Sequence, residues 1–154
     1  MSKSAKRPAS RFSMRRIPVP NWAPDHARGQ FELDGVSHQE YGSLQKRRPE
    51  ILAALDAAVD RYVKENSEPG DDSFPSRDRL TGEFYIGHET YSKQSSPASK
   101  KNSPASFQIS LFCRCLEQPR PGSDEPDDYL GLEVYVRCEP DGPCSALDID
   151  SSVI

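Results

Sequence analysis

Apolar and polar positions alternate most regularly near the C-terminus, between Asp127 and Ile154. From 130 to 138 every second residue is apolar or cysteine, and the residues between them are polar, aromatic or glycine. A period of two is typical of a strand with one face against a core. After a turn rich in proline and glycine, Leu147, Ile149 and Val153 share one face of a second strand. The pattern predicts a β-hairpin with an apolar face and an acidic face.

The length of the loop decides which side chains of this hairpin share a face. A three-residue loop would pair Cys138 with Cys144 and turn Asp148 and Asp150 toward the apolar face, where two unpaired carboxylates cost several kcal/mol. We therefore expect a four-residue loop, which pairs Cys138 with Ser145. The cross-strand pairs expected from this register are Leu147 with Val136, Ile149 with Val134, Asp148 with Tyr135 and Asp150 with Glu133.

This register gathers acidic and aromatic side chains on the face opposite the core. Asp150 lies opposite Glu133, and like charges in such a pair are destabilising by about 0.2–1 kcal/mol. Acids interleaved with tyrosines are suited both to burial at an interface and to electrostatic steering of a partner. The predicted partner-binding residues are Tyr129, Glu133, Tyr135, Asp148 and Asp150.

The remaining patterns predict one helix and two more strands. Apolar residues recur at helical spacing from Pro49 to about Asn66, and proline suits the first turn of a helix. The segments 82–91 and 107–115 are rich in aromatic and β-branched residues, as strands are. Together with the hairpin these elements predict an α+β fold, with one amphipathic helix packed on a four-stranded antiparallel meander whose strands follow sequence order.

Composition divides the chain into an arm and one domain. Residues 1–21 combine basic charge, serine and proline with few side chains that could enter a core, so we expect a flexible, disordered basic arm. Residues 22–154 are expected to form a single α+β domain with long polar loops at 92–106 and 117–128. The low mean hydropathy of −0.77 agrees with a large share of residues outside the core.

Neither a membrane-spanning run nor the apolar stretch of a secretory signal is present, so we expect a cytoplasmic protein with no membrane partner. In that compartment the four cysteines should be thiols or metal ligands rather than disulfides. Cys113 and Cys115 continue the apolar face of Ile109 and Leu111, and their spacing is not that of a zinc ribbon, which favours buried thiols and no metal. The expected register turns Cys144 away from the other three cysteines. The four cysteines are Cys113, Cys115, Cys138 and Cys144.

The net charge of −4 conceals a basic N-terminus and an acidic C-terminal part. Clustered Lys and Arg in a flexible segment favour nucleic-acid binding through release of counterions. The candidate phosphate-binding residues are Lys3, Lys6, Arg7, Arg11, Arg15, Arg16, Lys46, Arg47 and Arg48. The acidic remainder repels phosphate, and few aromatic residues are available to stack on bases.

Motifs for nucleotide binding or α/β-hydrolase chemistry are absent from the sequence, and we expect no cofactor. We therefore expect a non-enzymatic macromolecular interaction protein, such as a small inhibitor or an immunity or anti-defence protein. Its acidic sheet face would bind a basic protein partner, which could itself be a nucleic-acid-binding protein. The alternative is a nucleic-acid-associated accessory protein that uses the basic arm. A metal- or thiol-dependent enzyme ranks third, and the oligomeric state stays open.

Overall fold

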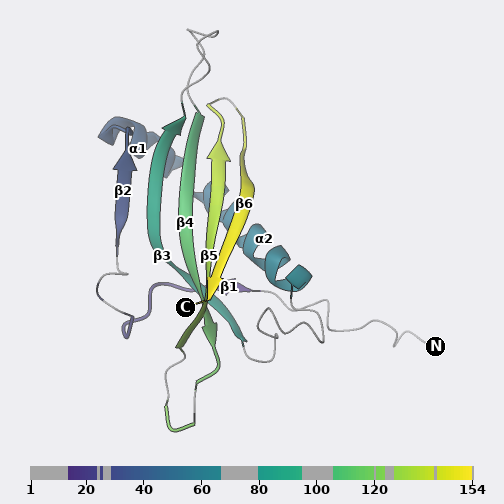
Figure 1. The fold of residues 1–154 in the computed structure, drawn as a ribbon. Coiled ribbons are helices and arrows are strands. Elements are labelled where there is room, and N and C mark those ends of the chain that lie inside the picture. The colour runs from purple at the N-terminus through teal and green to yellow at the C-terminus, as the bar shows by residue number, and fades with distance from the viewer. Residues whose placement is uncertain are drawn as a thin grey trace, which may run out of the picture.

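Two helices cover one face of a mixed, six-stranded sheet (Figure 1). The computed structural model describes residues 14–23, 25, 29–66, 80–94, 106–119, 121–123, 127–140 and 142–153. The elements are β1 (Arg15–Arg16), β2 (Phe31–Asp34), α1 (His38–Lys46), α2 (Arg48–Asn66), β3 (Leu80–Gln94), β4 (Ser106–Glu117), β5 (Asp127–Cys138) and β6 (Cys144–Val153). The α+β class is confirmed.

The predicted helix corresponds to α2, whose apolar stripe is buried against the sheet. Ile51, Leu55, Val59 and Val63 of this stripe have no exposed surface. The short helix α1 was not predicted, because its stripe contains few apolar residues. A capping box begins α1: the Ser37 side chain accepts a hydrogen bond from the N–H of Glu40, whose carboxylate accepts one from the N–H of Ser37.

The meander is confirmed, since β3, β4, β5 and β6 are antiparallel neighbours in sequence order. The predicted number of strands is wrong: β1 and β2 both pair in parallel with the same edge of β3. β1 pairs with Glu83 and Phe84, and β2 pairs with the segment 89–92. Strands of two and four residues are too short to show a period, so the alternation that predicted the meander did not reveal them.

Part of the predicted basic arm lies against the domain. Met14 is buried, and its N–H donates a 3.1 Å hydrogen bond to Asp60 Oδ1 of α2. Further along, the N–H of Ile17 donates to the carbonyl of Phe84 at 2.8 Å. Residues 1–13 of the predicted arm lie outside the described residues, as do positions 95–105, 120 and 124–126 of the two predicted loops.

The main core lies between the helices and the sheet, and β4 supplies its centre. Ile109, Leu111, Cys113 and Cys115 are fully buried on one face of that strand, as the alternation predicted. Cys113 and Cys115 are free thiols, so the interpretation of these two residues as small buried hydrophobes is confirmed.

The hairpin turn differs from the prediction. Cys138 pairs with Cys144 and Val136 with Ala146, so the expected Cys138–Ser145 and Val136–Leu147 pairs are wrong. Cys138 and Cys144 form a disulfide, so the expectation of thiols at these two positions is also wrong. A bulge at Leu147 lies between the Val136–Ala146 and Tyr135–Asp148 pairs. The extra residue restores the predicted register beyond it. The turn therefore has the Cys138–Cys144 pair that we expected only from a three-residue loop, and the bulge keeps Asp148 and Asp150 out of the core.

None of the helices that the structure describes has the length and apolar character required to cross a bilayer.

Candidate functional site

The sheet face opposite the helices, here called the outer face, carries the predicted partner-binding side chains. Leu132 and Val134 of β5 belong to the helix-side core, so the alternating Glu133 and Tyr135 point to the outer face. Two rows of cross-strand neighbours run over this face: His88, Phe112, Glu133 and Asp150 in one, and Thr90, Ser110, Tyr135 and Asp148 in the next. The predicted pairs Glu133–Asp150 and Tyr135–Asp148 are confirmed.

Four side chains of β5 and β6 form what we call the acidic patch: Glu133, Tyr135, Asp148 and Asp150. The Tyr135 hydroxyl donates to Asp150 Oδ2 at 3.3 Å, and the Ser110 hydroxyl donates to Glu133. Burial, followed by the charges of Glu133 and Asp150, raises the pKa of Tyr135. These hydrogen bonds hold the patch together without neutralising its charge.

No Lys or Arg of the described ranges forms an ion pair with the carboxylates of the acidic patch. Nearby cations have other partners: Arg137 pairs with Glu139 at 3.4 Å, and Arg114 lies over the ring of Phe112 at 5.0 Å. The fifth predicted residue, Tyr129, lies in β5, but its side chain is outside the described part of the structure. Within the described part of the chain, the patch is thus a cluster of negative charge without an ion-pair partner, although Arg61 of α2 lines the same groove as Asp148.

Among the described residues, the segment 17–23 covers the outer face near β3. This segment packs there against the buried side chain of Tyr85, and the ring of Trp22 meets the ring of Tyr85 edge-on at 6.5 Å. Asp148 and Asp150 are exposed on β6, three strands away from Tyr85 of β3. The figure shows both helices behind the sheet, so they do not cover the acidic patch (Figure 1).

Most of the described basic candidates already contact carboxylates of their own domain. Arg16 pairs with Asp56 at 3.0 Å, Arg47 with Glu50 at 3.1 Å and Arg48 with Glu89 at 2.7 Å.

Arg15 pairs with Glu83, whereas Lys46 is exposed in the last turn of α1. Lys3, Lys6, Arg7 and Arg11 lie outside the described residues. Each of the four arginines is held by a different carboxylate, although Arg16 and Arg48 line a common pocket. Pairing with carboxylates makes these arginines less available to phosphate.

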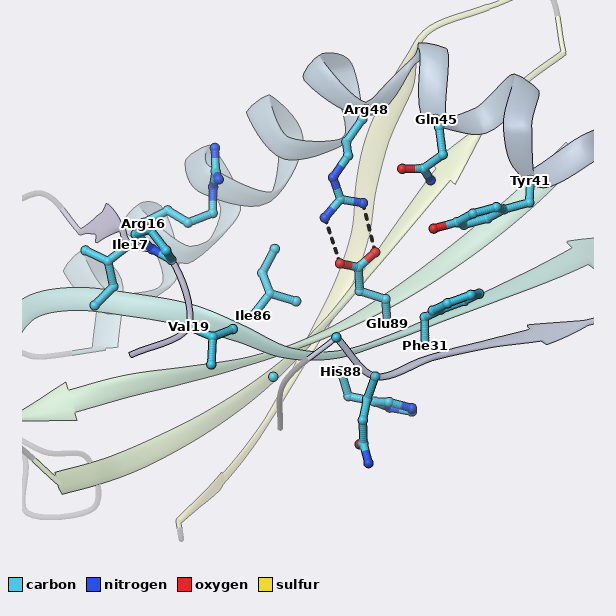
Figure 2. A pocket seen from close by; sticks show the side chains of 14 residues that line it. Arg16, Ile17, Val19, Phe31, Tyr41, Gln45, Arg48, Ile86, His88 and Glu89 are labelled. Atoms are coloured by element: carbon cyan, nitrogen blue, oxygen red, sulfur yellow. Dashed lines mark hydrogen bonds and ion pairs between the residues drawn. The ribbon is translucent and has the colours of Figure 1, made fainter. Parts of the chain in front are cut away.

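A pocket of about 340 Å³ opens beside β3, between its pairings with β1 and β2 (Figure 2). A bulge at Gly87 separates the Ile86–Cys113 pair from the His88–Phe112 pair. This bulge reverses the alternation of β3, so Glu89 points toward α2 and His88 toward the outer face. Phe31 and Tyr41 stack at 5.1 Å at one wall of the pocket.

Arg48 and Glu89 line this pocket and belong to a polar network that also includes Tyr91, which does not line it. Arg48 donates two hydrogen bonds to the Glu89 carboxylate, at 2.9 and 2.7 Å (Figure 2). The Tyr91 hydroxyl donates a third at 2.7 Å. Burial raises the pKa of Glu89, but the bonds from Arg48 and Tyr91 outweigh it and the net pKa is lowered. Glu89 is therefore ionised at neutral pH and paired, which does not suit a general acid.

The described residues provide neither a reactive thiolate at Cys113 nor a cluster of metal ligands. Burial raises the pKa of the Cys113 thiol well above its ordinary value, which disfavours the reactive thiolate. No group of three or more His, Cys, Asp or Glu residues in the described segments is arranged to hold a metal ion. The arrangement on the outer face is suited to binding through charge and hydrogen bonds.

Sequence reasoning identified the acidic patch but missed the pocket and its Arg48–Glu89 pair. Arg48 was considered only as part of a basic cluster. The only signal in the sequence was the possibility of a bulge near Gly87, which alters the phase of the residues after it.

Neither a scan against models of protein families nor searches of curated proteins and of solved structures found a match to this chain.

Proposed function

We propose that this protein is a non-enzymatic interaction protein whose acidic patch binds a basic surface of a protein partner. The observation that carries the proposal is the clustering of Glu133, Asp148 and Asp150 on an outer face where no cation of the described residues forms an ion pair with them. Opposite charges across an interface raise the rate of association and exclude partners of the wrong charge.

The cost of keeping these carboxylates together supports a binding role. Glu133 and Asp150 lie directly opposite each other, an arrangement that destabilises an isolated sheet by about 0.2–1 kcal/mol. A partner that supplies Lys or Arg to the patch removes this repulsion and adds charge-assisted hydrogen bonds. Tyr135 adds an aromatic ring and a hydroxyl, which are enriched in the centres of interfaces.

An inhibitor or immunity-type role follows naturally from this chemistry. A protein that covers a basic surface blocks whatever acidic ligand that surface would otherwise bind, including the phosphates of a nucleic acid. The alternative nucleic-acid-binding role receives less support from the described residues, because Arg15, Arg16, Arg47 and Arg48 already have carboxylate partners.

The proposal is tested by removing charge without changing side-chain shape. The test variant carries Asp148→Asn and Asp150→Asn, and a control variant carries Glu32→Gln and Asp34→Asn in β2. All four residues are exposed, and each variant loses two negative charges. Proteins captured from nuclease-treated host lysate are identified by mass spectrometry, purified, and titrated calorimetrically at low and high salt.

We expect the wild-type and control chains to retain a basic protein that the Asp148→Asn, Asp150→Asn variant loses. We also expect the affinity for this protein to fall as salt is added, because exposed charges are screened. If all three chains retain the same proteins with the same affinity, or if the protein that depends on the patch is acidic, the proposal is wrong.

A further inference from the structure

The strand β6 is the last in the described sheet order, and it carries Asp148 and Asp150 of the acidic patch. Its inner edge pairs with β5, and no other strand of the described residues pairs with its outer edge. Figure 1 shows β6 at one side of the sheet with α2 crossing behind it. The outer edge of a strand presents backbone N–H and C=O groups that another strand can bind.

A groove of about 230 Å³ lies between α2 and β6, along the helix side of this edge. Ala58 and Tyr62 of α2 and Ala146 and Ile149 of β6 supply its apolar lining. Arg61, Glu65, Leu147 and Asp148 complete the residues around it. The groove can therefore accept apolar side chains, with charged groups at its margins.

The bulge at Leu147 shapes this end of the edge. Leu147 is the extra residue between two cross-strand pairs, and 49% of its surface is exposed. From Asp148 to Val153 the pairing with β5 is regular. The edge thus combines an exposed apolar side chain beside the groove with a regular stretch of strand.

The side chains of any strand added to β6 would alternate between two different environments. On the helix side they would lie at the groove, next to Ile149 and Ala146. On the outer face they would lie next to Asp148 and Asp150. An apolar residue suits the first environment and a Lys or Arg suits the second.

We propose that β6 binds an extended segment of the partner by strand addition, and that this segment alternates apolar residues with Lys or Arg. The inference rests on the proposed function, because the acidic patch supplies the charge that selects the basic residues. Backbone pairing with β6 would provide affinity, and the two faces would provide specificity.

Charge favours a basic partner over a second copy of this chain. Antiparallel pairing of two β6 edges would bring Asp148 and Asp150 of both copies onto the same face. Like charges on neighbouring strands are destabilising, whereas opposite charges are stabilising. A basic extended segment therefore matches this edge better than the edge matches itself.

The test uses synthetic peptides as probes and the full chain as receptor. The parent probe is an end-capped, fluorescent octapeptide of alternating Val and Lys. A second probe has the same sequence with N-methyl groups at alternate residues, which removes the N–H donors of one peptide edge while the charge stays the same. A third probe has the same composition with its valines and lysines in separate blocks.

We expect the parent peptide to bind saturably and to shift the backbone amide resonances of Asp148–Ser151. The N-methylated probe is made in two forms, one for each edge of the peptide, because only one edge would face β6. The form methylated on the edge that faces β6 should lose about two backbone hydrogen bonds and bind about tenfold or more weakly than the parent. The block peptide should also bind more weakly. The Asp148→Asn, Asp150→Asn variant should lose affinity for the parent, whereas the Glu32→Gln, Asp34→Asn control should not.

The outcomes separate the two proposals. If both N-methylated forms bind as tightly as the parent while the Asp148→Asn, Asp150→Asn variant binds weakly, strand addition is wrong and the charge-based proposed function remains. Absence of any parent binding also overturns strand addition. If wild type and that variant bind all peptides equally and retain the same lysate proteins, the proposed function itself fails.

Discussion

Replacing Glu89 with Gln should destabilise the folded protein by about 2–3 kcal/mol, because it removes the countercharge of a partly buried guanidinium. The side chains of Glu89 and Arg48 are 16% and 31% exposed, and two hydrogen bonds of 2.9 and 2.7 Å join them. Breaking a fully buried pair from one side costs about 3–5 kcal/mol, and the partial exposure of Arg48 reduces this value. The corresponding fall in melting temperature is about 5–10 °C.

The assay is urea unfolding followed by circular dichroism, with thermal melts in parallel. The matched control is Glu50→Gln, which removes another glutamate that pairs with an arginine. The side chain of Glu50 is 50% exposed, so its loss should cost no more than about 0.5 kcal/mol.

A double variant tests whether the cost arises from an unpaired charge. Arg48→Met leaves the buried Glu89 carboxylate without its main partner, and burial then raises the pKa of that group. Arg48→Met combined with Glu89→Leu removes both charges and should cost clearly less than the sum of the single changes. The reasoning is refuted if Glu89→Gln costs no more than Glu50→Gln, or if the effects of the Arg48 and Glu89 changes simply add.

Three further predictions concern pH, the disulfide and the acidic patch. Because the pKa of Glu89 is lowered in the folded state, its stabilisation is present above the unfolded pKa of about 4.3 and is lost as pH falls through the folded value. The difference in stability between wild type and Glu89→Gln should therefore shrink in acid. A difference that stays constant with pH contradicts this prediction. Replacing Cys138 and Cys144 with Ser should lower the free energy of unfolding by about 2 kcal/mol, since the disulfide closes a loop with a sequence separation of 6. If a reductant does not change the urea unfolding of wild type, this prediction is wrong. Glu133→Gln should lower the raised pKa of Tyr135, measured as the difference in alkaline absorbance titration against Tyr135→Phe. An unchanged value would show that the charge of Glu133 does not contribute to the shift.

The elements that could be predicted are those with a period of their own. The stripe of Ile51, Leu55, Val59 and Val63 predicted α2, and all four side chains are buried. The alternation of the later segments predicted the meander and its order. The helix α1 has too few apolar residues for the same argument, and β1 and β2 are too short for it.

The hairpin shows why a physical argument can identify the right faces and miss the turn. Exclusion of Asp148 and Asp150 from the core predicted their cross-strand partners correctly. The reasoning assumed an unbroken ladder, so it rejected the Cys138–Cys144 pair. One extra residue at Leu147 reconciles that pair with outward-facing carboxylates, and nothing in the alternation marks this position as a bulge.

The sequence by itself determined the fold class, the meander and the two faces of its last hairpin, because these follow from local periodicity and from the cost of burying charge. Only the tertiary structure decided that β1 and β2 extend the sheet, that a bulge at Gly87 turns Glu89 inward and that Arg48, 41 residues away, pairs with it. These features depend on contacts between distant parts of the chain. A local pattern of polar and apolar residues carries no information about which distant segments meet.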